Sequence, residues 1–212
     1  MKILFVPAVI IFGWVIHHNI KRNKGNDKEQ ITSYLEKDAA ANFTRRGDIS
    51  KLPYIQIPYD KLPLDITLKD ENLQSKIEEY QRNIRELSDK KLLNLSGMDN
   101  ISLKANYGIA NLELLTAYEG NYNQYIRLLS LYANCIYKEY PSEAADICRY
   151  CIDIGSDIST TYTLLGAYYL SHHDEEHFEK LYDRIPDRET IAGKNIIRKL
   201  DDLKKTTNAD HF

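Results

Sequence analysis

Two cysteines separated by two residues, Cys148 and Cys151, form the Cys-x-x-Cys element of this sequence. Such an element can carry dithiol redox chemistry or supply half of a zinc site. A tetrahedral zinc site needs four ligands, and with 3 cysteines the chain has no second pair to offer. We therefore expect both thiols to be buried as small apolar groups, and we predict no cofactor and no metal ion.

A second candidate is the run HHDEEH at residues 172–177, where imidazole and carboxylate groups are adjacent. Its order differs from the His-Glu-x-x-His motif of zinc proteases, and Asp174 is placed to cap a helix. We expect an exposed turn. The sequence has no glycine-rich phosphate loop and no Gly-x-Ser-x-Gly motif. We therefore predict that the protein is not an enzyme, with an enzyme of unrecognised class as a distant alternative.

The composition is that of a globular protein, with 212 residues of which 43% are hydrophobic and 28% are charged. The net charge is -3, and basic residues are interleaved with acidic ones. Nucleic acid is not an expected partner, because no continuous basic face is available to neutralise phosphates. The odd number of cysteines favours a reducing compartment over a disulfide framework.

The amino terminus is predicted to be a membrane anchor over residues 1–20. The run from Ile3 to Ile16 carries no charge, although it is short beside the ~20 residues of a typical span. No pair of small residues follows it for signal peptidase, so we expect an uncleaved single transmembrane helix. Three basic residues at 21–24 follow the run, against Lys2 and the terminal amine before it. This bias predicts a cytoplasmic C-terminal body.

Residues 21–49 are predicted to be a polar juxtamembrane linker with a short helix at 32–41. Residues 50–66, SKLPYIQIPYDKLPLDI, have a proline at every fifth position, which forbids a helix and favours an extended backbone. Because apolar residues lie between the prolines, this strap is expected to dock on the rest of the protein. It is either a structural strap or an autoinhibitory segment in a partner groove.

Residues 67–93 are predicted to form one long amphipathic helix that starts near Thr67. A helical array is expected over 101–206, followed by a disordered tail at 207–212. Gly120 and Gly155 are expected to end helices, and Pro141, Asp157, Asp174 and Asp187 to lie at helix starts. The predicted helices of the array are 101–118, 123–138, 142–154, 158–171, 175–185 and 188–205.

Apolar positions in the array recur after a step of 34 residues, which is typical of a helical solenoid. A backward step reaches Ala110, Leu114 and Ala117, which predicts a third copy of the second helix. The register places Cys148 and Cys151 at apolar positions, which supports their burial. The matched pairs are Leu128 with Tyr162, Leu131 with Leu165, Tyr132 with Gly166, Cys135 with Tyr169, Ala144 with Phe178, Cys148 with Tyr182, and Cys151 with Ile185.

Residues 103–185 resemble the tetratricopeptide repeat through the element Leu165, Gly166 and Tyr169 and through Tyr182 in the next helix. Tyr132 and Phe178 depart from the repeat pattern, where a small residue is expected. The resemblance implies an all-α, tetratricopeptide-like helical repeat solenoid of about six to seven helices. Together with the anchor predicted from the uncharged run, this places the solenoid behind an N-terminal single transmembrane helix.

A wider resemblance is carried by the stretches ANFTRRGDISKLPYIQIPYDKLP, KLLNLSG and YGIANLELL. They look like an uncharacterised group of small, singly membrane-anchored bacterial proteins. This resemblance supports the architecture and implies no chemistry.

In a tetratricopeptide-like solenoid the first helix of each pair lines the concave face, which predicts an apolar partner groove. We expect a membrane-tethered, non-catalytic interaction module, an adaptor or scaffold. Its partner is an unknown protein or peptide, or the groove is filled by the chain's own residues 50–66 or by its own helix at 68–92. The alternative is an extracytoplasmic anchored accessory of envelope assembly or secretion. The predicted groove residues are Ile126, Leu129, Ala133, Ile136, Tyr137, Thr160, Thr163, Ala167 and Leu170.

Overall fold

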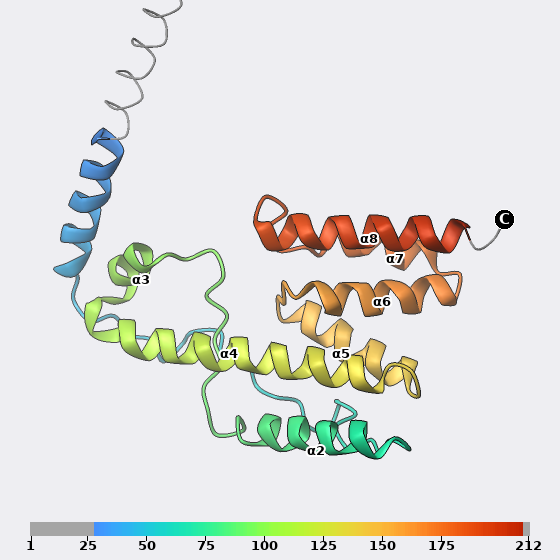
Figure 1. Ribbon diagram of the computed structural model, residues 1–212. Coiled ribbons are helices and arrows are strands. Elements are labelled where there is room, and N and C mark those ends of the chain that lie inside the picture. Colours follow the sequence, from blue (N-terminus) through green and yellow to red (C-terminus); the bar gives the residue numbers. More distant parts are fainter. Residues whose placement is uncertain (1–27, 210–212) are drawn as a thin grey trace, which may run out of the picture. The chain divides into compact units, whose positions relative to one another are not determined.

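A computed structural model of the chain describes residues 28–209, and within this range the only regular elements are helices. The prediction of an all-helical fold is thus confirmed for these residues (Figure 1). A single antiparallel bridge pairs Ile55 with Leu92. A helix at residues 28–42 comes first, followed by α2 (Glu71–Arg85), α3 (Asn100–Tyr107), α4 (Ile109–Ile136), α5 (Pro141–Asp153), α6 (Ser159–Ser171), α7 (Glu175–Asp183) and α8 (Ile191–Ala209).

The predicted anchor at residues 1–20 lies outside the described residues, as does the start of the linker. Among the helices that the structure does describe, none combines the length and apolar character needed to cross a membrane.

The chain divides into two compact units by its internal contacts. Within the described range, the first unit contains residues 28–50 and Gly97–Glu113, and the second contains Lys51–Ser96 and the chain from Leu114 onward. The boundary between the two units falls inside α4, between Glu113 and Leu114.

The first unit is held together around Asn111, whose side chain is fully buried. Its amide nitrogen donates to the carbonyls of Gly47 and Tyr107 at 2.8 and 2.7 Å, and its oxygen accepts from Arg46. These bonds join the segment after the helix at 28–42 to the junction of α3 and α4. Gly108 adopts φ +80° there, and a Cβ on it would lie 2.6 Å from the Arg45 carbonyl oxygen. The stretches ANFTRRGD and YGIANLELL therefore meet in this unit.

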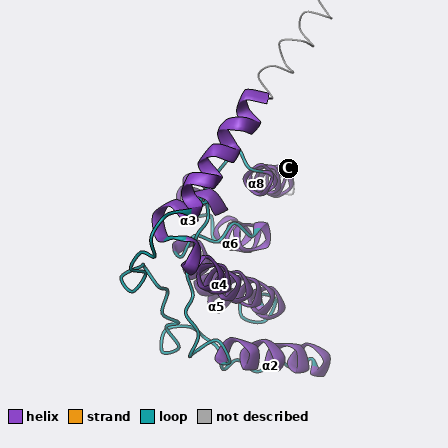
Figure 2. Cartoon of the chain, turned by 90° about the vertical axis from the view of Figure 1, so that its left-hand side faces the viewer, coloured by secondary structure: helices purple, strands orange, loops and turns teal. Residues whose placement is uncertain are grey.

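The second unit stacks α2, α4, α6 and α8 in that order, as both ribbon views show (Figures 1 and 2). Helix α6 contacts α5, α7 and α8. Gly166 of α6 allows close approach, because a Cβ at this position would lie 3.0 Å from Phe178 and 3.2 Å from Leu200. A side chain larger than hydrogen would push these helices apart.

The predicted repeat register describes burial in part. Leu128 and Tyr162 are both buried at matched positions, and so are Tyr132 and Gly166. In contrast, Leu131 is 39% exposed although its counterpart Leu165 is 2% exposed. The backward extension is wrong for burial, since Ala110, Leu114 and Ala117 are all exposed. These three side chains of α4 are open to solvent, whereas α6 is contacted by α5, α7 and α8.

The predicted long helix at residues 67–93 is too long at both ends, because α2 spans only Glu71–Arg85. Asp70 is its N-cap and accepts from the backbone of Asn72 and Leu73. After the helix, Leu87, Leu92, Leu93 and Leu95 are all buried. The helix gives way to a turn, and Leu92 then pairs with Ile55 in the antiparallel bridge, which a continuous helix would not allow.

Gly120 does not end a helix, contrary to the sequence expectation, and α4 runs through it. A glycine inside a helix costs only about 1 kcal/mol relative to alanine. Burial of Leu115, Tyr122 and Tyr125 on either side of it outweighs that cost. The break occurs instead at Gly108, which separates α3 from α4.

Other helix ends match the expectations unevenly. Gly155 follows α5 with φ +89°, Pro141 opens α5, and Asp174 caps α7. Asp157 is not a cap, because the N-cap of α6 is Ile158. Helix α8 begins at Ile191 rather than 188, and it continues to Ala209 into the predicted disordered tail. Residues 210–212 lie outside the described residues.

Candidate interaction surfaces

The strap at residues 50–66 and α2 pack against α4 and α5. Leu62 and Leu64 of the strap are 8% and 5% exposed and join one core cluster with Ile77 and Ile84 of α2. Leu129 of α4 belongs to the same cluster. The apolar side chains of the strap therefore contribute to the interior rather than to the surface.

Three tyrosines of the α4–α5 hairpin, Tyr132, Tyr140 and Tyr150, form what we call the tyrosine face. Their hydroxyls donate to main-chain carbonyls of Pro63 at 2.9 Å, Thr67 at 3.2 Å and Gln56 at 3.5 Å, respectively. An extended segment rich in proline has carbonyls that no neighbouring strand satisfies, and such groups need donors when they are buried. The tyrosine face supplies such a donor to the Pro63 carbonyl, where the bond is partly buried, and adds two exposed bonds to Thr67 and Gln56.

Burial supports the donor role of these hydroxyls. Desolvation raises the pKa of Tyr132 and of Tyr150 above the ordinary tyrosine value, which favours the protonated form that donates. Gln81 of α2 adds a donor to the Ile66 carbonyl at 3.2 Å and another to the Tyr132 oxygen at 3.3 Å. This segment is thus held by hydrogen bonds to its backbone carbonyls as well as by the packing of its leucines.

The predicted groove residues fall into two classes. Four of them lie in the core, with Ile126 at 4% and Leu129, Ala133 and Ile136 at 0% exposed. These four are not open to a partner in this structure. They belong to the cluster that the strap and α2 complete.

The other five predicted groove residues are half-buried: Tyr137, Thr160, Thr163, Ala167 and Leu170. Four of them follow one another at spacings of three and four along α6, so they share one face of that helix. This α6 face is the accessible part of the predicted groove.

The two cysteines of the Cys-x-x-Cys element are fully buried in α5, as the repeat register predicts. Burial raises the pKa of Cys148 to about 12 and raises that of Cys151 as well. Both thiols are therefore protonated at neutral pH, whereas the thiolate is the form that attacks disulfides and binds metals.

The predicted exposed turn is present at residues 172 and 173, and the rest of the run leads into α7, which begins at Glu175. His173 adopts φ 56°, and Asp174 accepts from the backbone of His177 and lies 2.8 Å from its ring. His172 packs against Tyr168 with ring centroids 4.2 Å apart. No group of three metal-binding side chains occurs among the described residues.

A cavity of about 310 Å³ lies among α5, α6 and α7. Its floor is apolar, and its rim carries Arg149, Lys180 and Arg184. Each of these cations is already paired: Arg149 with Asp146, Lys180 with Glu176 and Arg184 with Asp153. The rim is therefore electrically balanced and has no preference for an acidic ligand.

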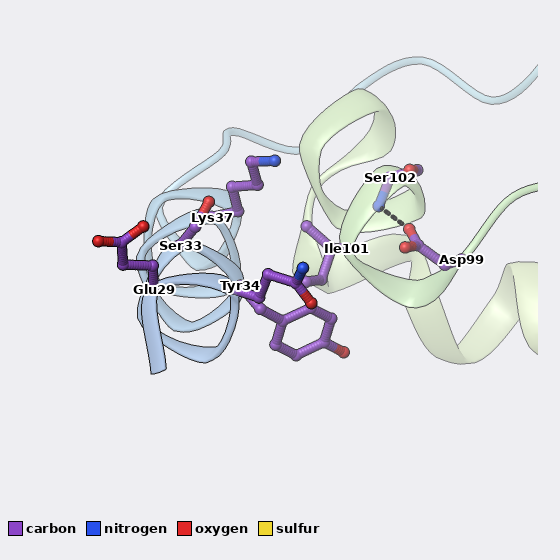
Figure 3. A pocket seen from close by; sticks show the side chains of 8 residues that line it. Glu29, Ser33, Tyr34, Lys37, Asp99, Ile101 and Ser102 are labelled. Carbon is purple, nitrogen blue, oxygen red and sulfur yellow. Dashed lines mark hydrogen bonds between the residues drawn. The ribbon is translucent and has the colours of Figure 1, made fainter. Parts of the chain in front are cut away.

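A larger open cavity of about 600 Å³ lies in the first unit, between the helix at 28–42 and the start of α3 (Figure 3). Tyr34 and Ile101 come from these two elements, and Asp99 accepts from the backbone nitrogen of Ser102 at 2.7 Å. The remaining lining residues are polar: Glu29, Gln30, Ser33 and Lys37. The cavity is wide and open at the surface.

Sequence reasoning did not identify the tyrosine face as a site. One of its residues did stand out in the sequence, because Tyr132 occupies a repeat position where a small residue is expected. No protein-family model matches the sequence, and neither a similar curated protein nor a similar solved structure was found.

Proposed function

We propose that this protein is a membrane-tethered, non-catalytic protein–protein interaction module whose helices form a tetratricopeptide-like solenoid. The observation that carries the proposal is that the α4–α5 hairpin holds an extended segment of its own chain through the tyrosine face. Helical repeats that bind peptides use the same combination of apolar contacts and bonds to the peptide backbone.

The tight packing around Gly166 supports the solenoid part of the proposal. In the tetratricopeptide repeat a small residue at this position brings neighbouring helices together, and here Gly166 lies against Phe178 of α7. The α6 face is the proposed partner surface, because its residues are half-buried. Leu129, in contrast, lies in the core cluster that contains the leucines of the strap.

A photo-crosslinking amino acid placed at Leu170 tests this surface in native membranes. We expect a discrete crosslinked product, which disappears when Thr163→Asp is added. A matched control carries the crosslinker at Glu176, which is exposed on α7, and it should give no such product. Equal products from both positions would contradict the proposal. Leu129 is unsuitable for the test, since Asp at a fully buried position would unfold the chain.

The strap needs a separate test, because it is either structural or autoinhibitory. Leu64 is 5% exposed, so Leu64→Ala should lower the free energy of unfolding by about 2–4 kcal/mol if the strap is structural. Lys61→Ala, at an exposed position in the same segment, is the control. A stable variant that binds added peptides corresponding to residues 50–66 would instead indicate autoinhibition.

The proposed location is a single-pass anchor with a cytoplasmic body, and the alternative places the body outside as an accessory of envelope assembly or secretion. The variant Asn123→Cys in a Cys135→Ser background offers one exposed thiol, since Cys148 and Cys151 are buried. Labelling of intact cells with an impermeant maleimide should fail if the body is cytoplasmic and succeed if it is extracytoplasmic.

A further inference from the structure

The helix at residues 28–42 carries an uncovered apolar face in its first half. Ile31, Tyr34 and Leu35 are 59%, 57% and 60% exposed, although spacings of three and four residues place them on one side of the helix. Exposed clusters of this kind on a helix mark a docking surface.

The second half of the same helix is covered. Ala41 is 3% exposed, and Asp38 forms an ion pair of 2.8 Å with Lys104 of α3. Leu103 of α3 is also buried, at 3% exposed. Helix α3 therefore covers one side of the end of the helix. At the beginning, Tyr34 lines the open cavity together with Ile101 of α3, whereas Ile31 and Leu35 are not among the residues that line it.

The sequence before this helix indicates what covers it. The uncharged run Ile3–Ile16 is separated from Lys28 by residues 17–27, a distance that an extended chain spans in about 40 Å or less. The basic residues Lys21, Arg22 and Lys24 lie in that interval. They favour an anionic lipid surface, and an amphipathic helix held next to such a surface partitions into it.

A second copy of the chain fits the face less well. The apolar stripe continues into Asp38, which is already paired with Lys104, so only about two helical turns remain for self-association. Stable coiled coils need several heptads of apolar positions.

We propose that the first half of the helix at 28–42 lies on the membrane surface, with Ile31 and Leu35 inserted among the lipid headgroups and Glu36 facing water. The inference rests on the proposed membrane anchor and adds to it that the tether ends in an interfacial helix. The body of the protein is then held close to the bilayer.

The test uses the full chain in liposomes of phosphatidylcholine and phosphatidylglycerol. An NBD fluorophore is attached at Leu35→Cys, with Glu36→Cys as the matched control, both in the Cys135→Ser background. Both positions are exposed, so neither substitution disturbs the core. We expect doxyl-labelled lipids to quench the fluorophore at position 35 at least about twofold more strongly than at position 36, because adjacent helical positions face different sides.

Two outcomes would overturn the inference alone. Equal quenching at positions 35 and 36 would show that the face does not contact lipid. Protection of position 35 from aqueous iodide without quenching by lipid would show that protein covers it instead. Loss of the chain from liposomes washed with alkaline carbonate would overturn the proposed anchor as well, so the two failures are distinguishable.

Discussion

The Cys148 thiol is buried in α5, and this burial raises its pKa to about 12. In the unfolded chain a cysteine ionises near pH 8.5. Between these values only the unfolded state loses the proton, so the stability from this group is intact below pH 8.5 and falls as the pH rises toward 12.

We expect Cys148→Ala to lose less stability than the wild type when the pH is raised from 7.5 to 10. The difference should be on the order of 2 kcal/mol, since each pH unit between the two pKa values contributes about 1.4 kcal/mol. Urea unfolding at both pH values measures it. Cys135→Ala, at a half-buried position, should show a smaller difference, and identical pH dependence for wild type and Cys148→Ala would contradict the expectation.

The hydroxyls of the tyrosine face can be tested one at a time. Tyr132→Phe removes the donor that lies 2.9 Å from the Pro63 carbonyl, so it should cost about 1–2 kcal/mol of unfolding free energy. Tyr150→Phe removes a much longer contact of 3.5 Å to Gln56 and should cost less than about 0.5 kcal/mol. Chemical denaturation of both variants compares the two, and the absence of any cost from Tyr132→Phe would mean that the strap is held by its leucines alone.

At the scale of elements, the two glycines expected to end helices have opposite environments. A Cβ on Gly120 would meet nothing within 4 Å, whereas a Cβ on Gly155, which adopts φ +89°, would lie 2.5 Å from the Asn94 side chain. That Asn94 amide donates to the Ile154 carbonyl at the end of α5 and to the Tyr122 oxygen. Gly155 is therefore required for a helix end, and Gly120 is not.

Gly120→Ala should raise the free energy of unfolding by about 0.5–1 kcal/mol, because alanine favours the interior of a helix. Gly155→Ala should lower it by at least about 1 kcal/mol, because the backbone is left-handed and the space is occupied. Thermal unfolding followed by circular dichroism measures both. Destabilisation by Gly120→Ala would mean that α4 is broken at this point in solution.

The helices of the array were predictable because their apolar periodicity and their caps agree, as at Pro141, Asp174 and Gly155. The sequence misled where a local signal competed with long-range packing. Gly120 looks like a helix end, yet the tyrosines beside it pull the segment into one continuous helix. Leu92 looked like the end of a long helix, yet it pairs with Ile55 in a bridge that only tertiary structure reveals.

The candidate site was predictable only in part, for a similar reason. The repeat register identifies which helix positions turn inward, and Leu129 and Ala133 do so. It cannot state whether another element of the same chain covers them. The tyrosine face depends on contacts between residues 50–67 and 132–150, and their backbone hydrogen bonds leave no trace in the pattern of side chains.

For the whole molecule, the division into two units predicts that a substitution that destabilises one unit leaves the amide-exchange protection of the other unchanged. Asn111→Ala removes three bonds from a fully buried side chain in the first unit. It should accelerate amide exchange in residues 43–50 and 100–113 by roughly tenfold or more, which corresponds to a loss of about 1–3 kcal/mol. Residues 141–200 should keep their protection.

Hydrogen exchange followed by mass spectrometry measures both regions in one experiment. Asn106→Ala is the control, because Asn106 is exposed on α3. Equal loss of protection throughout the chain would mean that the two units unfold as one.

The position of the strap ahead of the helices it packs on has a consequence for biosynthesis. Residues 50–66 leave the ribosome before α4 and α5 exist, so Leu62 and Leu64 have no interior to enter at that stage. At 5–20 residues per second, translation of residues 69–153 takes roughly 4–17 s. During that interval the leucines of the strap lack the surface on which they pack, so burial of the strap waits for completion of the α4–α5 hairpin.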